Sequence, residues 1–218
     1  MGTRADTVSS LEAAKEEFEK AWHHPAYTQV ELPAVDVNKV LTERYSASAP
    51  IRLTRAMIWD MELKKAWDPA TYIPYVVSEG ASWARHQLQE GGERFFRSSI
   101  QRAWISEERG RVLEDVFIDH PSQKIIFLGR PKMTDETGQV LRAGKDQPIF
   151  HVEHAAGGSE REPLNLWRII ILTESRDQRF NQAIMEVAEK GLLPGFLEIY
   201  IERDLQIKLQ AHPKLTNV

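Results

Sequence analysis

The first regular spacing of apolar residues lies near the N-terminus and predicts a short amphipathic helix. Apolar side chains recur there every three or four residues among charged ones, as on one helical face: Leu11, Ala14, Phe18 and Trp22. Ser9 stands three residues before Glu12, which is the spacing of a capping box, and Pro25 ends the pattern. Because so short a helix is marginal by itself, its stripe must pack on another surface. We interpret residues 1–34 as an N-terminal helical appendage with its connector, and residues 35–218 as the main domain.

The patterns that follow the connector are weaker. Residues 36–48 favour a strand by a narrow margin, since their apolar residues are loosely spaced. Residues 50–66 nearly alternate, as in a strand, yet several of their apolar residues also share one helical stripe. Good helix formers dominate this segment and Pro50 suits a first helical turn, so a helix is favoured, with Ser48 as its cap. Residues 68–74 predict a short turn between prolines, and a glycine-containing connector follows.

The middle of the chain changes character and predicts an antiparallel sheet. Phenylalanine, valine, isoleucine and tryptophan are concentrated in short runs that are bounded by turn residues. Short strands joined directly in this way pair with their neighbours in sequence order. The runs cover residues 94–105, 111–118, 123–130, 148–154 and 164–173, with a candidate sixth strand at 139–142.

The end of the chain predicts a long helix with a break. An apolar stripe runs through residues 177–190, is interrupted by Gly191 and Pro194, and resumes at Phe196. A glycine after a helix with a proline three residues further on is a stop or kink signal. We therefore expect one long terminal helix that is bent or broken at this point.

Composition and charge exclude several classes of protein. Apolar residues make up 42% of the 218 residues, which is enough for one substantial core. The 28 basic and 32 acidic residues give a net charge of -4, so we expect no nucleic-acid partner. Cysteine is absent, which removes disulfides, thiolate nucleophiles and cysteine metal clusters. No apolar run reaches the roughly 18–20 residues that cross a bilayer, and no signal-peptide pattern begins the chain, so a cytoplasmic protein without integral membrane association is expected.

The first candidate for a functional segment is His151-Val152-Glu153-His154. On a strand these side chains alternate, so the two histidines face opposite sides and cannot close on one metal ion without a bulge. His154 shares its face with apolar neighbours, which suits a proton donor or acceptor or a ligand partner. The alternative is a core histidine that is bonded to the backbone. No phosphate loop, nucleophile elbow or zinc signature occurs, so we expect no cofactor and no bound metal.

Arg168 is the second unusual residue, because alternation places it among the leucines and isoleucines of its run. A buried guanidinium without a partner is very costly. We expect Arg168 to pair with an acid of a neighbouring strand or to anchor an anionic group of a ligand. The acids considered are Glu114, Asp115 and Glu153.

The order of predicted elements resembles the helix-grip fold of the START and polyketide-cyclase (SRPBCC) superfamily, which includes birch-pollen-allergen-like proteins. Residues 46–50, ending in Ala49-Pro50, are similar to the end of that family's first strand and the start of its first helix. Three further parts of the chain resemble later features of that family, namely Trp59-Asp60, the segment 68–74 and the break at Gly191. The resemblance covers roughly residues 37–210. It implies an α+β fold in which a curved antiparallel sheet wraps around a long interrupted C-terminal helix, with the N-terminal helix as an addition.

Such a sheet and helix enclose a cavity suited to an apolar molecule. We therefore expect binding of a small hydrophobic or aromatic ligand, with Arg168 as a possible anchor. The residues expected to line the cavity are Trp104, Phe117, His154, Trp167 and Phe196.

Two alternatives stay open. The first is an enzyme of the same fold, a cyclase, dehydratase or hydrolase that uses His154 as acid or base. The second is an interaction module in which the N-terminal stripe pairs with a partner or with a second copy of the chain, giving a homodimer.

Overall fold

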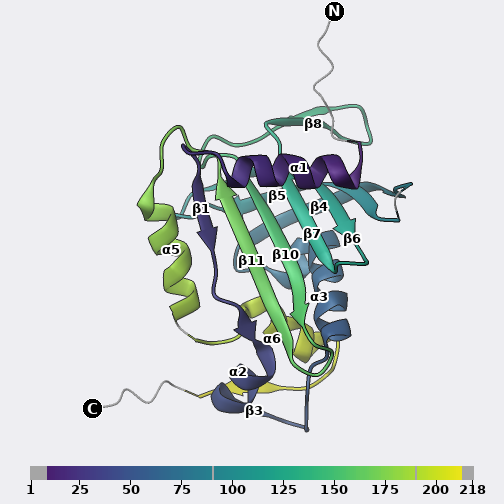
Figure 1. Cartoon of the computed structure of the whole chain (residues 1–218), viewed down its shortest axis with the longest axis vertical. Coiled ribbons are helices and arrows are strands. Elements are labelled where there is room, and N and C mark those ends of the chain that lie inside the picture. The colour runs from purple at the N-terminus through teal and green to yellow at the C-terminus, as the bar shows by residue number, and fades with distance from the viewer. Residues whose placement is uncertain (1–8, 90, 190, 213–218) are drawn as a thin grey trace, which may run out of the picture.

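The computed structural model describes residues 9–89, 91–189 and 191–212, and shows one large antiparallel sheet with helices on both faces (Figure 1). The strand order is β1-β11-β10-β7-β6-β5-β4, and β2 also pairs with β11. Between β11 and β4 the strands turn steeply, so the sheet curls (Figure 1). The strands are β1 (Thr28–Glu31), β2 (Val35–Asp36), β4 (Val77–Gln87), β5 (Glu93–Arg102), β6 (Arg109–Asp119), β7 (Lys124–Gly129), β10 (Phe150–Gly158) and β11 (Pro163–Ile171).

Helices and two small sheets make up the remaining elements. The small sheets pair β3 (Tyr45–Ala47) with β12 (Leu209–Ala211), and β8 (Lys132–Thr134) with β9 (Val140–Arg142). The helices are α1 (Leu11–Trp22), α2 (Val37–Arg44), α3 (Arg55–Trp67), α4 (Pro69–Tyr72), α5 (Gln178–Glu189) and α6 (Gly195–Arg203).

The larger core lies on the inner face of the sheet, which we define as the face that α3 covers. Thr54 caps α3, its Oγ1 accepting a hydrogen bond from the Met57 amide at 3.2 Å. The helix packs on β10, β11 and β7, and α6 in turn packs on α3 and α4. Buried apolar side chains from every second strand position meet these helices, among them Phe95, Val116 and Ile169. This inner layer is the part of the fold that positions the candidate site.

A second core lies on the outer face, where α1 crosses the strands (Figure 1). Ser10 caps α1, and the predicted stripe packs against Phe117, Ile126 and Ile170 of the sheet. Three ion pairs hold the helix at its sides, namely Lys15–Asp119 at 2.9 Å, Glu17–Arg130 and Glu19–Arg168 at 2.6 Å. The stripe is therefore used within the chain, so it is not the free surface that the interaction-module hypothesis requires.

The predicted meander is confirmed, because its five runs form β5, β6, β7, β10 and β11 in the expected antiparallel pairing. The candidate sixth strand at 139–142 belongs instead to the separate β8–β9 hairpin. The strand that completes the main sheet beside β5 is β4, within the stretch interpreted as a connector.

Two interpretations of the first third are wrong. Residues 36–48 are mainly helix α2, because the side chain of Asp36 accepts a hydrogen bond from the Lys39 amide at 3.0 Å and caps a helix there. The segment 28–31, assigned to the appendage, forms β1 and pairs with β11. Residues 1–34 therefore supply an edge strand of the main sheet as well as α1.

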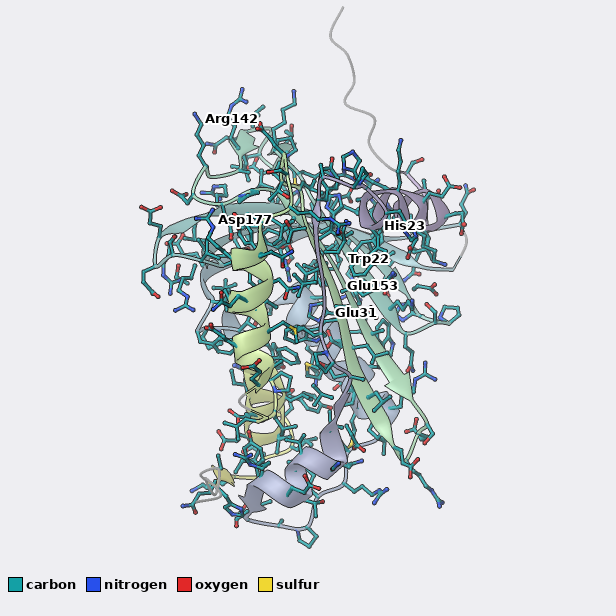
Figure 2. The ribbon with its side chains drawn as sticks, turned by 60° about the vertical axis from the view of Figure 1, so that its left-hand side comes forward. Trp22, His23, Glu31, Arg142, Glu153 and Asp177 are labelled. Atoms are coloured by element: carbon teal, nitrogen blue, oxygen red, sulfur yellow. The ribbon has the colours of Figure 1, made fainter. Side chains whose placement is uncertain are left out.

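The C-terminal break is confirmed and is a complete interruption. Helix α5 ends at Glu189, and α6 begins at Gly195 after Pro194. Helix α5 lies along β1 at the edge of the sheet (Figures 1 and 2). The helix that packs most directly on the central strands is thus α3, with α6 outside it.

These observations confirm an α+β helix-grip fold. The first strand lies beside the last, helices separate it from a run of antiparallel strands, and a helix follows the last strand of the main sheet. This element order agrees with the fold that the sequence resemblance implies.

Candidate functional site

Four polar side chains meet on the inner face of the sheet, and we call them the inner polar cluster: Glu62, Lys65, His154 and Asn165. Glu62 and Lys65 lie one turn apart on α3, so both point from the same side of the helix toward the sheet. His154 comes from β10, and Asn165 comes from β11. Glu62 is 0% exposed and Lys65 is 3% exposed. The cluster therefore places two charged groups inside the larger core.

Short contacts connect the members of the cluster. Lys65 Nζ lies 2.6 Å from Glu62 Oε2 and 2.6 Å from His154 Nδ1. His154 Nδ1 is in turn 3.2 Å from Glu62 Oε2. Asn165 Nδ2 donates to Glu62 Oε1 at 2.7 Å, and its own Oδ1 accepts a hydrogen bond from Trp167 Nε1 at 2.7 Å. Glu62 Oε1 thus accepts a hydrogen bond from Asn165, whereas the buried Oε2 has ionic contacts with Lys65 and His154 but no hydrogen bond of good geometry.

Aromatic rings surround the cluster. His154 and Trp167 face each other across the β10–β11 pair, and their ring centres are 4.9 Å apart. Phe196 of α6 lies 5.2 Å from Trp167, and Phe127 of β7 lies 5.6 Å from His154. Lys65 Nζ is 3.8 Å from the centre of the Phe196 ring, which is a cation–π contact. The charged cluster is therefore enclosed by apolar, polarisable walls.

Burial and mutual charge shift the pKa values of all three titratable members. Burial alone would raise the pKa of Glu62, but the positive charge of Lys65 and contacts with His154 outweigh it and lower the pKa to about 2. Burial lowers the pKa of Lys65 to about 8, although Glu62 opposes the shift. Burial and then the charge of Lys65 lower the pKa of His154 to about 4. At neutral pH the cluster holds a carboxylate, an ammonium group and a neutral imidazole.

A neighbouring buried ion pair fixes the end of α3. Arg97 Nε of β5 donates to Glu114 Oε2 of β6 at 2.7 Å. Its Nη1 donates to the Ala66 carbonyl in the last turn of α3 at 3.0 Å. A cation at the C-terminus of a helix satisfies carbonyls that lack helical partners and favours the helix dipole. Arg97 thus attaches the helix that carries Glu62 and Lys65 to the sheet.

Three of the predicted site residues come together, namely His154, Trp167 and Phe196. Trp104 lies elsewhere on the inner face and packs edge-on against Phe150, with ring centres 5.5 Å apart. Phe117 is fully buried on the outer face beneath α1, because side chains alternate along β6. Phe117 does not face the C-terminal helices.

Arg168 also lies on the outer face, and its partner is the predicted Glu153. The Arg168 Nε donates to Glu153 at 2.9 Å, and Nη2 donates to Glu19 of α1 at 2.6 Å. Its guanidinium carbon lies 4.9 Å from the ring centre of Phe18 and 5.1 Å from that of Trp22. Figure 2 shows Trp22 and Glu153 on this side of the molecule. The guanidinium of Arg168 thus already contacts two acids and two aromatic rings. The structure therefore favours a structural ion pair over a role as an anchor for a ligand.

Glu62, Lys65 and Asn165 were not predicted from the sequence as site residues. The signal for the first two was present once 55–67 is taken as a helix, since they share the side of Ile58 and Met61, which are buried. Asn165 precedes Trp167 by two residues, so it shares the tryptophan's face of β11.

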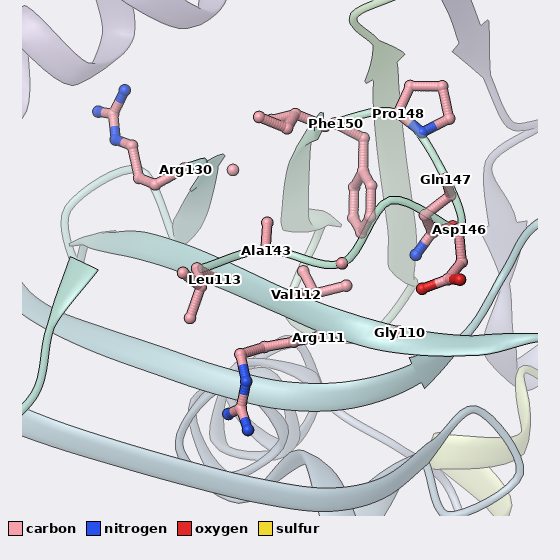
Figure 3. Close-up of a pocket in the computed structure, with 13 residues that line it drawn as sticks. Gly110, Arg111, Val112, Leu113, Arg130, Ala143, Asp146, Gln147, Pro148 and Phe150 are labelled. Atoms are coloured by element: carbon pink, nitrogen blue, oxygen red, sulfur yellow. The ribbon is translucent and has the colours of Figure 1, made fainter. Parts of the chain in front are cut away.

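Two hollows stand out in the part of the chain that the structure describes, and neither adjoins the inner polar cluster. A cavity of about 20 Å³ lies between β6, β7 and the segment 143–149, with Phe150 and Asp146 in its lining (Figure 3). It has room for about one water molecule. An open groove of about 400 Å³ lies beside α2 and β3, lined by Leu41, Tyr45 and Ile51 among others. Beside His154, where the cavity was expected, the rings of Trp167 and Phe196 pack against each other with their centres 5.2 Å apart.

Within the described residues, no three His, Asp or Glu side chains are grouped so that they could hold a metal ion. In the same part of the chain, no helix has the length and apolar character needed to cross a membrane.

Comparisons with known proteins concern the fold. No family model matches the sequence, and no curated protein matches it. A similar solved structure is the Zhui aromatase/cyclase from Streptomyces sp. R1128, with 11% identity, a TM-score of 0.45, and coverage of 81% of this chain and 95% of that chain. A START superfamily protein from Mycobacterium smegmatis has 9% identity and a TM-score of 0.41, covering 75% of this chain and 98% of its own. Human STARD10 has 9% identity and a TM-score of 0.46, covering 94% and 85%.

Proposed function

We propose that this protein binds a small hydrophobic or aromatic molecule on the inner face of the sheet, beside the inner polar cluster. The observation that carries the proposal is the burial of Glu62 and Lys65 among the rings of Trp167, Phe196 and Phe127. A buried ion pair adds little to stability compared with apolar packing of the same volume. Titratable groups with strongly shifted pKa values, held together in an apolar interior, are typical of functional sites.

A ligand enters this site by separating rings that now touch. Trp167 is half-buried, and Phe196 is carried by α6, which the segment 191–194 separates from α5. Displacement of Phe196 opens the space over Lys65 and Trp167 without breaking the sheet. The aromatic walls then hold the apolar body of the ligand, while Glu62, Lys65 and His154 meet its polar end.

The test uses N-phenyl-1-naphthylamine, an apolar probe whose fluorescence rises on leaving water. We expect saturable binding, and Trp167→Ala should weaken it about tenfold, which corresponds to roughly 1.4 kcal/mol. The matched control is Trp22→Ala, because Trp22 is also half-buried but lies on the outer face. Equal losses in the two variants, or no saturable binding of the probe or of fatty acids, sterols and polyketide-like aromatics, contradict the proposal.

A second candidate is an enzyme of the same fold, a cyclase, dehydratase or hydrolase in which His154 moves a proton. The contacts of His154 Nδ1 with Lys65 Nζ and Glu62 Oε2 favour it, because they form a path along which a proton can pass. In that case His154→Gln abolishes turnover while probe binding remains. Full turnover by that variant contradicts the role of His154.

A further inference from the structure

We propose that Lys65 forms a reversible imine with the carbonyl group of a bound aromatic or conjugated aldehyde or ketone. The inference rests on the proposed ligand-binding function and names its substrate class. Lys65 is the one buried lysine among the residues that the structure describes, and its amine lies inside the aromatic enclosure.

The surroundings of the amine suit this chemistry. Its two polar side-chain contacts are Glu62 Oε2 and His154 Nδ1, and neither is a backbone group that would hold it permanently. On another side the amine faces the Phe196 ring at 3.8 Å, in the space that a planar ligand takes when this ring moves. An amine in apolar surroundings, flanked by groups that exchange protons, is the arrangement that activates lysine toward carbonyl carbon.

The step balances without an added oxidant or reductant. Lys65 starts as an ammonium group and passes one proton to His154 Nδ1. The free nitrogen pair forms a bond to the carbonyl carbon, and the carbonyl oxygen takes one proton from that nitrogen and one back from His154 before it leaves as water. The product is a protonated imine, so the positive charge next to Glu62 is retained. Water added back to the imine carbon reverses every step.

The protonation state of the Lys65 amine also supports the proposed imine. With a pKa of about 8, roughly a tenth of Lys65 is free amine at pH 7. Its neighbour Lys64 gives the contrast on the same helix. Hydrogen bonds from Lys64 Nζ to Asp204 and Asp60, at 2.8 Å each, raise the pKa of Lys64 and keep the amine protonated.

The experiment incubates the full chain with cinnamaldehyde and sodium cyanoborohydride, which reduces an imine to a stable amine. Peptide mapping by mass spectrometry then compares Lys65 with Lys64. We expect at least about tenfold more labelling at Lys65, consistent with the difference in free amine. Cinnamyl alcohol, which lacks the carbonyl, should compete and lower labelling of Lys65 alone. Lys65→Arg should lose the adduct, with circular dichroism to verify its fold.

The outcomes separate the two proposals. If cinnamyl alcohol binds saturably and Lys65 stays unlabelled, the imine is wrong and ligand binding stands. Labelling spread over exposed lysines in proportion to their exposure also overturns the imine. If neither compound binds saturably and Lys65 is unlabelled, both proposals fail.

Discussion

The carboxylate of Glu62 and the ammonium group of Lys65 are held out of water by α3 and by the strands beneath it. Removing one such charge leaves the other buried without its partner, which strongly lowers the stability of the folded protein. Removing both leaves no unpaired charge in the core. Glu62→Leu and Lys65→Met should therefore each lower the free energy of unfolding by about 3–5 kcal/mol. The double variant Glu62→Leu/Lys65→Met should lose much less than the sum of the two.

A urea-denaturation cycle measures this coupling. The control is the exposed pair Arg102 and Glu107, whose coupling should stay below about 1 kcal/mol. Additive losses at Glu62 and Lys65 would show that the two side chains do not depend on each other.

Stability should fall in mild acid because of His154. Its pKa is about 4 in the folded protein and 6.5 in the unfolded chain, so between these values the unfolded chain binds the extra proton. The free energy of unfolding therefore falls as the pH drops from 6.5 to 4, by up to about 3 kcal/mol at 1.36 kcal/mol per pKa unit. The lowered pKa of Glu62 continues the loss from pH 4.5 to about 2. Lys65 acts in the same sense at higher pH, because its pKa of about 8 lies below 10.5, so stability rises with pH between these values.

Thermal unfolding across pH 4–7 checks this expectation. His154→Gln should flatten the curve in part between pH 4 and 6.5, since it removes one of two buried histidines. His151→Gln should flatten it in part, because burial also lowers the pKa of His151 to about 4. His23→Gln, at the exposed end of α1, serves as control and should leave the slope unchanged. An unchanged slope in both buried variants contradicts the assignment.

At the scale of elements, α1 depends on Phe18 more than on its ion pairs. Phe18 is 1% exposed and packs on the outer face, whereas the acids that pair with Arg130 and Arg168 are half-buried or exposed. Phe18→Ala should lower the free energy of unfolding by about 3–5 kcal/mol, because it removes a ring and leaves a void. The control Glu16→Ala, exposed on the same helix, should change it by less than about 0.5 kcal/mol. Chemical denaturation measures both, and similar small changes would mean that α1 is only loosely attached.

Elements with a strong pattern were predictable, and those without one were not. The apolar strands β6, β7 and β11 are buried on both faces, so their composition identified them. Strand β4 is an edge strand in which only Val77 and Trp83 are buried, so no apolar alternation marks it. Strand β1 is short, and its sequence Thr-Gln-Val-Glu gives a single buried apolar residue. Helix α2 has a weak stripe and depends on the Asp36 cap.

The same contrast explains which residues of the candidate site could be predicted from the sequence. His154, Trp167 and Phe196 were expected to line one cavity because of the resemblance to the helix-grip fold, and the structure brings these three together. Glu62 and Lys65 required the register of α3, which the near alternation of 50–66 left open. The sequence did not show on which face of the sheet α1 would pack. Phe117 and Arg168 could therefore not be assigned to the inner or the outer face from sequence.

At the scale of the whole molecule, α6 is attached to α3 and α4 by a polar network. Tyr200 donates to Asp60 at 2.9 Å, and Tyr72 donates to Asp204 at 2.9 Å, with Lys64 joining the two acids. If movement of α6 admits the ligand, weakening this network should speed entry. We expect Tyr200→Phe to raise the association rate of N-phenyl-1-naphthylamine several-fold while costing about 1 kcal/mol of stability.

Stopped-flow fluorescence measures the rate, and Tyr27→Phe, on the outer side, is the control. An unchanged association rate in Tyr200→Phe, with the same loss of stability, would mean that α6 does not limit entry.

The pairing of β1 with β11 has a consequence for how the protein is made. Thr28 pairs with Ile171, so the edge of the sheet is built from segments near opposite ends of the chain. A ribosome synthesises the first of these long before the second, and native pairing of β1 must wait until β11 has emerged. Contacts so distant in sequence also slow refolding of the finished chain. During synthesis, the nascent N-terminal segment exposes the apolar stripe of α1 before its docking surface has formed. This is the interval in which we expect the chain to depend most on a chaperone.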